Sequence, residues 1–197
     1  MAKIKNFKIP VYYYDIQRRI KKLGINLNNV FGENPETNFK EFVSNIISLI
    51  KLSAIYDNID SKELEKIFDE NYKEFFKSKD VDVISFSIIT FGNELEKKVF
   101  ELNDTESVIV KSIINVHLNT ATKFLMDAIS EEAKKENYNL SDPEFLYING
   151  EFKTNISLNN LLNQLESNKI MVELSDGKIK PFYTQIFYNK WVYKKKK

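Results

Sequence analysis

The sequence contains no cysteine and a single histidine, and these two scarcities exclude several classes of site. Without a thiol the chain can form no disulfide, no thiolate nucleophile, no iron–sulfur cluster and no cysteine-ligated zinc site. With one histidine it cannot build a two-histidine metal pair or the two-histidine iron triad. The lack of cysteine fits a reducing cytoplasm, which is the predicted location.

An excess of charge of one sign is also missing, because 29 Lys and Arg residues face 28 Asp and Glu residues and leave a net charge of +1. Such a chain has no overall field that attracts nucleic acid or anionic lipid, so neither partner is expected. No apolar run approaches the roughly 20 residues that span a bilayer, and the N-terminal segment lacks the apolar core of a signal peptide. The one block of like charge, residues 194–197, is predicted to be a flexible basic tail.

Bulky apolar side chains are plentiful by contrast. Hydrophobic residues make up 43% of the chain, which includes 15 Phe and 10 Tyr. A chain of 197 residues with this composition is expected to fold as one compact domain, residues 1–197, with a sizeable core. The mixture of helical and strand-like patterns along it predicts an α+β fold.

The first half of the chain alternates between these patterns. They predict helices within 12–25, from 38 onward and over 61–77, and strands over 52–59 and 83–91. Gly24 is the expected stop of the first helix, and Asn38 with Glu41 has the spacing of a capping box that opens the second after a polar loop. The run at 83–91 is almost entirely apolar, β-branched and aromatic, so it is the predicted central strand, covered on both faces.

The second half shows two further pairs with capping-box spacing. They predict helices that begin after Gly92 (Asn93 and Glu96) and at Asn103 (with Glu106). The second of these helices is expected to reach about residue 136, with a kink allowed near 115–122, where β-branched residues and Asn weaken helix propensity. After it the patterns predict a loop or hairpin over 137–155 with a turn at Asn149-Gly150, a short helix opened by Ser157, and strands over 170–174 and 185–193 that flank a turn at Asp176-Gly177.

Thr90, Phe91, Gly92 and Asn93 join the central strand to the short helix, and they could form either a turn or an anion site. A loop that cradles phosphate needs several glycines, because consecutive N–H groups must approach the anion without an intervening Cβ. This segment has one glycine and a capping residue, which favours a structural turn. The alternative is an N–H-rich helix start that meets a carboxylate or phosphate.

His117 falls among apolar residues of the long predicted helix. Packing as a neutral side chain is therefore favoured over a role as a general base or ligand contact. The paired acidic residues lie at predicted helix starts, in loops or on solvated faces, where carboxylates favour the helix dipole or water. No catalytic residue and no metal site is predicted.

The aromatic side chains near the C-terminus are expected to pack in the sheet rather than to stack on a ligand. Alternation places Phe187, Trp191 and Tyr193 on one face of the last strand and Tyr188 on the other. This pattern is typical of a strand with both sides partly covered.

Three segments follow one another in an order that resembles a known family. They are "YYYDIQRRIKKLGI" (12–25), "ISFSIITFGNELEKKVFEL" (84–102) and "LNNLLNQLESNKIMVELSDGKIKP" (158–181). They resemble the opening helix-to-glycine segment, the strand with its Thr-x-Gly turn and Glu-bearing helix, and the late helix, strand and proline of the activation domain of cobalamin-dependent methionine synthase. The resemblance implies a single α+β domain around a twisted antiparallel sheet flanked by helices. In the full-length enzyme that domain binds S-adenosylmethionine to remethylate an inactive cobalamin.

The ligand-binding signature of that family, an arginine followed by Pro-Gly-Tyr before the late helix, is replaced here by "FLYINGEFKTNISL". Glu151, Phe152 and Lys153 occupy the place of the Pro-Gly-Tyr. Arginine supplies a planar fork for a carboxylate, whereas Lys153 offers a flexible point charge. The small-residue stretch that the family carries on its long helix appears here as residues 115–119. The S-adenosylmethionine site is therefore expected to be altered or lost.

The leading hypothesis is an accessory or binding module of corrinoid methyl transfer, without independent catalytic activity. It would dock on a corrinoid-binding or methyltransferase protein through the sheet and the 137–155 loop, and would meet cobalamin only through that partner. One alternative is a working reactivation protein that binds S-adenosylmethionine, with Lys153 at the carboxylate and Tyr147 or Phe152 against the adenine. The other is a structural or oligomeric protein without a ligand.

Overall fold

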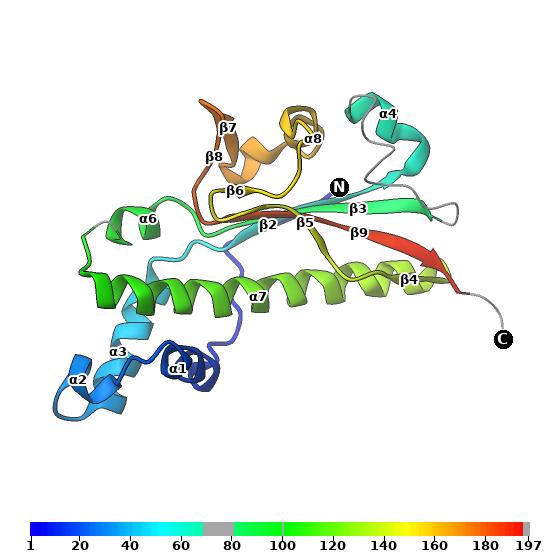
Figure 1. Cartoon of the computed structure of the whole chain (residues 1–197). Helices are drawn as coiled ribbons and strands as arrows, with labels where there is room; N and C mark the ends of the chain where they lie inside the picture. Colours follow the sequence, from blue (N-terminus) through cyan, green and yellow to red (C-terminus); the bar gives the residue numbers. More distant parts are fainter. Residues whose placement is uncertain (69–80, 100, 195–197) are drawn as a thin grey trace.

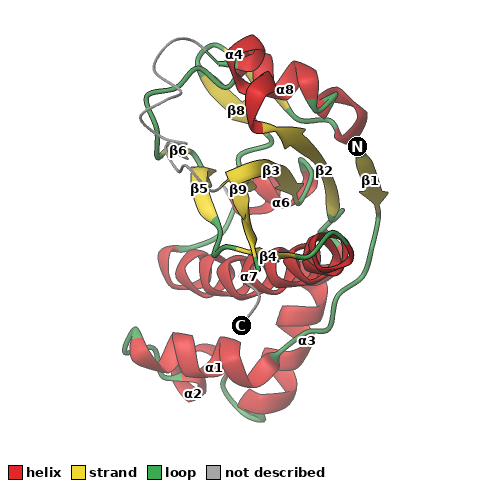
Figure 2. Cartoon of the chain, turned by 90° about the vertical axis from the view of Figure 1, so that its right-hand side faces the viewer, coloured by secondary structure: helices red, strands yellow, loops and turns green. Residues whose placement is uncertain are grey.

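The computed structural model of the protein describes residues 1–68, 81–99 and 101–194. The chain forms a compact α+β domain around an antiparallel sheet (Figure 1). Figure 2 shows the layers in order: a group of N-terminal helices, one long helix, the sheet, and a second layer of short helices on its far side. The predicted α+β class and the antiparallel sheet flanked by helices are confirmed.

The main sheet runs in the order β1-β2-β3-β9-β5-β6, with β4 paired to one end of β9, and every pairing is antiparallel. Its strands are β1 (Ala2–Lys5), β2 (Ser53–Asp60), β3 (Val81–Thr90), β4 (Tyr138–Leu140), β5 (Glu144–Ile148), β6 (Glu151–Phe152) and β9 (Thr184–Tyr193). The predictions of strands at 52–59, 83–91 and 185–193 are confirmed. So is the hairpin at Asn149-Gly150, which joins β5 to β6.

The two central strands, β3 and β9, are apolar on both faces because a hydrophobic cluster lies on each side of the sheet. In β3, Phe86 belongs to the cluster under the short helices and Ile89 to the cluster beside the long helix. In β9, Phe187 and Trp191 face the long helix, and Tyr188 faces the other way. The predicted central place of β3 and the predicted alternation along β9 follow directly from this two-sided burial.

The long helix α7 (Asp104–Lys135) crosses one face of the sheet (Figure 1). It begins at the predicted capping box, where Asn103 Oδ1 accepts the Glu106 N–H (2.9 Å) and the Glu106 carboxylate accepts the Asn103 N–H (3.3 Å). The helix is uninterrupted through residues 115–122, the segment in which the sequence allows a kink. Among the described helices, α7 included, none is both long enough and apolar enough to cross a membrane.

Three helices lie on the side of α7 away from the sheet (Figure 2): α1 (Tyr13–Lys22), α2 (Leu27–Phe31) and α3 (Pro35–Ser48). The first predicted helix is thus confirmed, but the capping box predicted at Asn38 and Glu41 is wrong. Pro35 opens α3, because proline tolerates the first helical position, where its missing N–H costs nothing. The Asn38 amide instead donates to the carbonyl oxygens of Phe31 and Glu33, at 2.9 Å each, and holds the preceding loop.

The far face of the sheet is covered by α4 (Leu64–Ile67), α8 (Asn159–Gln164), the 3₁₀ turns η1 (Ser61–Glu63) and η2 (Ser167–Ile170), and the hairpin of β7 (Glu173–Ser175) and β8 (Lys178–Lys180). The predicted arrangement of the last strands is wrong, because β7 pairs with β8 across Asp176-Gly177 and β9 pairs with β3. Ser157 does not open α8 either; the helix begins at Asn159, after Leu158.

Two predictions reach beyond the described residues. Of the helix expected over 61–77, residues 61–67 form η1 and α4, and 69–77 lie outside the described part of the chain. Of the basic tail at 194–197, only Lys194 is described, and its N–H donates to Asn137 O (3.1 Å).

The packing of α7 gives a first prediction. Leu118 on α7 is 0% exposed, whereas Leu23 after α1 is 55% exposed. We expect Leu118→Ala to lower the free energy of unfolding by about 2–5 kcal/mol, because it leaves a cavity between layers, and Leu23→Ala to change it by less than about 0.5 kcal/mol. Urea unfolding of the two variants measures both, and equal losses would contradict the burial of this helix.

Candidate functional site

The turns that follow β3 and β5 and the turn that precedes β9 meet at one end of the sheet. Asn149 N–H donates to Thr184 O (3.0 Å), and Thr184 Oγ1 lies 3.0 Å from Thr90 Oγ1. The turn after β3 leads into α6 (Glu94–Val99), which lies beside this end of the sheet at the left of Figure 1. We call residues 90–96, 147–153 and 181–184 the sheet-end site.

The turn from Thr90 to Gly92 donates its backbone N–H groups to the protein itself. Gly92 N–H points to Thr90 Oγ1 (3.3 Å), and Phe91 N–H donates to Tyr183 O (3.1 Å). Lys51 N–H donates to Phe91 O (2.9 Å), and a Cβ on Gly92 would lie 3.3 Å from Lys51 Cβ. These contacts are typical of a turn that joins a strand to a helix. The N–H groups of Phe91 and Gly92 both point to atoms of the protein, so neither is directed at a ligand.

Glu96 and Phe182 join α6 to the turn before β9. The spacing of Asn93 and Glu96 predicts a capping box. In the structure Asn93 is exposed, and the Glu96 carboxylate accepts the N–H of Phe182 (3.2 Å). The Phe182 ring lies over Gly150, so closely that a Cβ there would be 2.3 Å from Phe182 Cε2. Phe182 is 41% exposed and stands edge-on to Tyr183, with 5.1 Å between the ring centroids. An aromatic ring of the protein itself thus covers the hairpin turn.

Three of the residues proposed from the sequence as ligand contacts, Tyr147, Phe152 and Lys153, come together on the β5–β6 hairpin. The rings of Tyr147 and Phe152 meet edge-to-face, with 5.2 Å between centroids. Tyr147 is 1% exposed and its OH donates to Ile179 O (3.4 Å), whereas Phe152 is 42% exposed. The Lys153 ammonium pairs with the Glu151 carboxylate of the same hairpin. Phe152 and Lys153 are therefore accessible from solvent, and Tyr147 is part of the core.

The electrostatics of this end of the sheet favour neutral phenols. Burial raises the pKa of Tyr147 and Tyr183 above that of an ordinary phenol, and the nearby Glu96 carboxylate adds to the shift. The hydrogen bond from Lys153 holds the pKa of Glu151 below its usual range. At neutral pH both tyrosines are uncharged, so neither supplies a nucleophilic phenolate.

His117, the fourth residue proposed as a ligand contact, lies apart from the other three. It projects from α7 and meets the ring of Phe91 edge-on, with 5.7 Å between centroids. Phe91 belongs to the cluster beside α7, whereas Tyr147 belongs to the cluster on the opposite face of the sheet. Burial lowers the pKa of His117 to about 4. The sheet therefore separates this neutral, enclosed imidazole from any ligand held by the hairpin.

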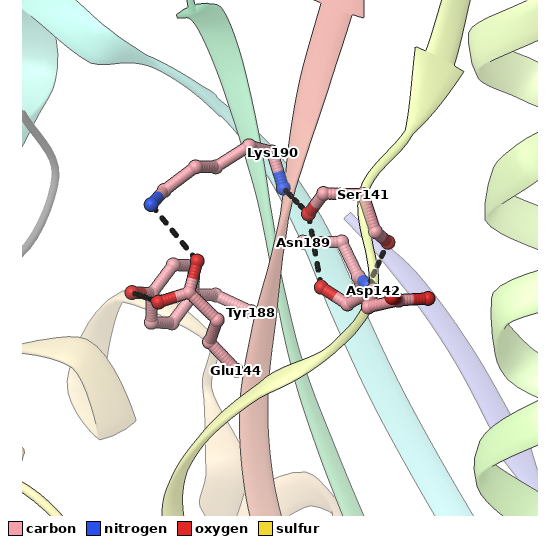
Figure 3. Close-up of polar contacts among 6 residues, drawn as sticks. All are labelled: Ser141, Asp142, Glu144, Tyr188, Asn189 and Lys190. Carbon is pink, nitrogen blue, oxygen red and sulfur yellow. Dashed lines mark hydrogen bonds and ion pairs between the residues drawn. The ribbon is translucent and has the colours of Figure 1, made fainter. Parts of the chain in front are cut away.

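A second polar cluster, which the sequence did not predict, joins β9 to β5 and to the segment before β5 (Figure 3). Tyr188 OH donates to Glu144 Oε2 (2.5 Å), and Lys190 Nζ lies 2.8 Å from Glu144 Oε1. Burial and the hydrogen bond to Glu144 raise the pKa of Tyr188. Burial alone would raise the pKa of Glu144, but the hydrogen bonds from Lys190 and Tyr188 outweigh it, so the pKa of Glu144 is lowered. Beside them, Ser141 O accepts from the Asn189 amide and Ser141 Oγ from Lys190 N–H, at 2.9 Å each. These bonds tie the segment between β4 and β5 to β9.

A third cluster is a chain of hydrogen bonds between β9 and the C-terminal part of α7. Trp191 Nε1 donates to Ser85 Oγ (2.7 Å), and Ser85 Oγ donates to Asn58 Oδ1 (2.7 Å). Asn58 Nδ2 and Tyr56 OH both donate to the Glu132 carboxylate, at 3.0 and 2.6 Å. Burial, and then the bond to Glu132, raise the pKa of Tyr56. In the sequence, the signal of this cluster is Ser85, one of two serines in the mostly apolar central strand.

Neither a metal centre nor a known family identifies the site. Within residues 1–68, 81–99 and 101–194, no group of three or more His, Asp or Glu side chains is placed to hold a metal ion. No protein-family model matches this chain, and no curated protein matches it.

The contact between Gly150 and Phe182 can be tested against a matched turn. Gly150 (φ +94°) and Gly177 (φ +72°) both follow a polar residue in a hairpin turn, but no atom lies within 4 Å of a Cβ at Gly177. We expect Gly177→Ala to lower the free energy of unfolding by about 1–2 kcal/mol through backbone strain alone. Gly150→Ala is expected to cost about 2–4 kcal/mol, because strain and the ring contact add. Equal losses in urea unfolding would show that the ring does not press on the turn.

The single histidine gives a pH-dependent prediction. With a pKa of about 4 in the folded chain and about 6.5 when unfolded, His117 binds a proton first in the unfolded state. Its contribution to stability is therefore complete above pH ~6.5 and falls as the pH drops toward 4. We expect NMR titration of the imidazole to give a midpoint near 4, and His117→Gln to lack this part of the pH dependence. A midpoint near 6.5 would contradict the burial.

Proposed function

We propose that the chain is a binding module of a corrinoid methyl-transfer system, with the fold of the methionine synthase activation domain but without that domain's S-adenosylmethionine contacts. It docks on a corrinoid-carrying protein and carries out no reaction of its own. One observation carries the proposal: the hairpin turn that stands at the ligand-binding position of the resembled family is covered by Phe182 of the chain itself.

The order of elements supports the link to that family. A central strand β3 leads through Thr90-Phe91-Gly92 into α6 and then into the long helix α7. Helix α8, strand β7 and Pro181 follow in the order that the resemblance implies. The sheet is antiparallel throughout, as that family's fold requires.

The side chains of the hairpin support the loss of the small-molecule contacts. A ligand carboxylate at Lys153 would have to compete with Glu151, which already pairs with the ammonium. An adenine at Tyr147 would have to displace core packing, since this ring is 1% exposed. No arginine is present in the hairpin to supply a planar two-donor fork.

The rim of the sheet-end site is the surface that best suits a protein partner. Helices and short turns cover both faces of the sheet, so a partner that docks through the sheet and the 137–155 loop, as the sequence predicts, would meet the rim of the sheet rather than one of its faces. The rings of Phe152 and Phe182 remain about two-fifths exposed, and the partly exposed Glu96 lies next to Phe182. Exposed aromatic rings with a polar neighbour are typical anchors of a protein interface.

Reactivation with bound S-adenosylmethionine is the second candidate, and one observation favours it. Phe152 offers an exposed ring face beside Lys153, and Glu96 supplies a carboxylate within the same site, which suits a ligand that carries an adenine and a cationic sulfonium.

Calorimetry separates the two candidates. We expect no measurable heat with S-adenosylmethionine or S-adenosylhomocysteine, and binding of an isolated cobalamin-binding domain that Phe152→Ala/Phe182→Ala weakens about tenfold or more. Phe124→Ala, which removes an equally exposed ring from α7, is the control and leaves that binding unchanged. A dissociation constant for S-adenosylmethionine below roughly 100 µM, about −5.5 kcal/mol, that rises in Lys153→Ala would establish the second candidate instead. Failure to bind both the ligand and the domain would refute both.

A further inference from the structure

The N-terminal helix α1 and the middle of α7 enclose a groove that the proposed function does not use. It has a volume of about 500 Å³ and lies on the side of α7 away from the sheet. The side chains that can reach a ligand in it are Arg18, Arg19 and Lys22 from α1, and Asn119, Thr120 and Lys123 from α7. Both views of the molecule place α1 beside α7 (Figures 1 and 2).

Helical spacing explains why these side chains face one another. Residues three and four positions apart lie on one side of a helix. The two facing stripes consist of Tyr12, Asp15, Arg19 and Lys22 along α1, and of Val116, Asn119, Thr120 and Lys123 along α7. The adjacent stripe of α1, Ile16 and Ile20, is buried in the core and fixes the helix against its neighbours. The groove is therefore held by packing rather than by a loop.

The groove gathers positive charge that the chain does not neutralise. Four basic side chains face one acidic side chain, which gives +3, although the whole chain carries +1. Arg18 lies 3.6 Å from Asp15, but in the described part of the chain Arg19, Lys22 and Lys123 form no ion pair. The dipole of α1 accounts for basic residues in its last turn, but not for Lys123, which comes from the middle of another helix. Like charges held around one cavity repel unless an anion joins them.

We propose that this groove binds a small anion that carries two or more phosphate groups, an organic or inorganic polyphosphate. Arg19 and Lys123 approach such a ligand from the two helices, and the exposed Asn119 amide lies one helical turn before Lys123 on the α7 wall. Arginine and lysine are the usual phosphate-binding side chains, and the volume suits a small ligand. Tyr12, which is exposed at the groove, offers a ring face to a nucleobase attached to the phosphates.

Titration calorimetry of the full chain with inorganic triphosphate and with ATP, at low ionic strength, tests the proposal. We expect both to bind, and added salt to weaken binding because the contacts are exposed charges. Arg19→Ala/Lys123→Ala removes one cation from each wall and is expected to raise the dissociation constant about tenfold or more. Asp15→Asn removes the one acidic side chain and is expected to lower it. Lys62→Ala/Lys178→Ala, on the far side of the sheet, is the matched control and leaves it unchanged.

The same titrations include the results that would overturn the proposal. No binding of either ligand at about 1 mM, or equal affinity in wild type and Arg19→Ala/Lys123→Ala, refutes it. Tighter binding of ATP than of triphosphate, lost in Tyr12→Ala, supports it with a nucleotide as the ligand, and equal binding supports it with the polyphosphate alone. A single-stranded oligonucleotide that binds more tightly than either at equal phosphate concentration replaces the small anion with nucleic acid. None of these results depends on whether a corrinoid protein binds the sheet-end site.

Discussion

Helix α7 is buried on two sides, and the positions of the N-terminal helices and of the sheet depend on this burial. One side of this helix packs against β3 and β4, and Thr122 Oγ1 on it donates to Gln185 Oε1 of β9 (2.8 Å), while another side meets α1 and α3. A helix covered on two sides needs apolar residues around much of its circumference, which is why its sequence shows no single apolar stripe. At its C-terminal part, Glu132 adds a polar tie to the sheet through Tyr56 and Asn58. The helix therefore sets the positions of the N-terminal helices and of the sheet at the same time.

The segment 115–122 of α7 illustrates how one helix serves two different surfaces. His117 packs beneath the Thr90–Gly92 turn through Phe91, whereas Asn119 lines the groove with α1. Each residue turns the direction of the side chain by about 100°, so positions two apart face different layers. The sheet-end site and the groove are thus supported by neighbouring residues of the same rigid element, although they lie on opposite sides of it.

At the sheet-end site, side chains of the protein itself contact both the hairpin turn and its lysine. The hairpin brings Phe152 and Lys153 to the surface, but Glu151 satisfies the ammonium and Phe182 covers the turn at Gly150. The site exposes the rings of Phe152 and Phe182 together with the Glu151–Lys153 pair, and this mixed aromatic and polar surface is the one that the proposed protein partner would meet.

The elements whose signals are local could be predicted from the sequence. Its two-sided apolar run placed β3 at the centre, the Asn103–Glu106 box opened α7, and Asn149-Gly150 closed a hairpin. Three features carry no local signal and depend on tertiary packing: the pairing of β9 with β3, the contact of Phe182 with Gly150, and the groove between α1 and α7. Capping and periodicity act over three or four residues, whereas β3 and β9, and likewise the facing charges of α1 and α7, lie about a hundred residues apart in the chain and are brought together by packing.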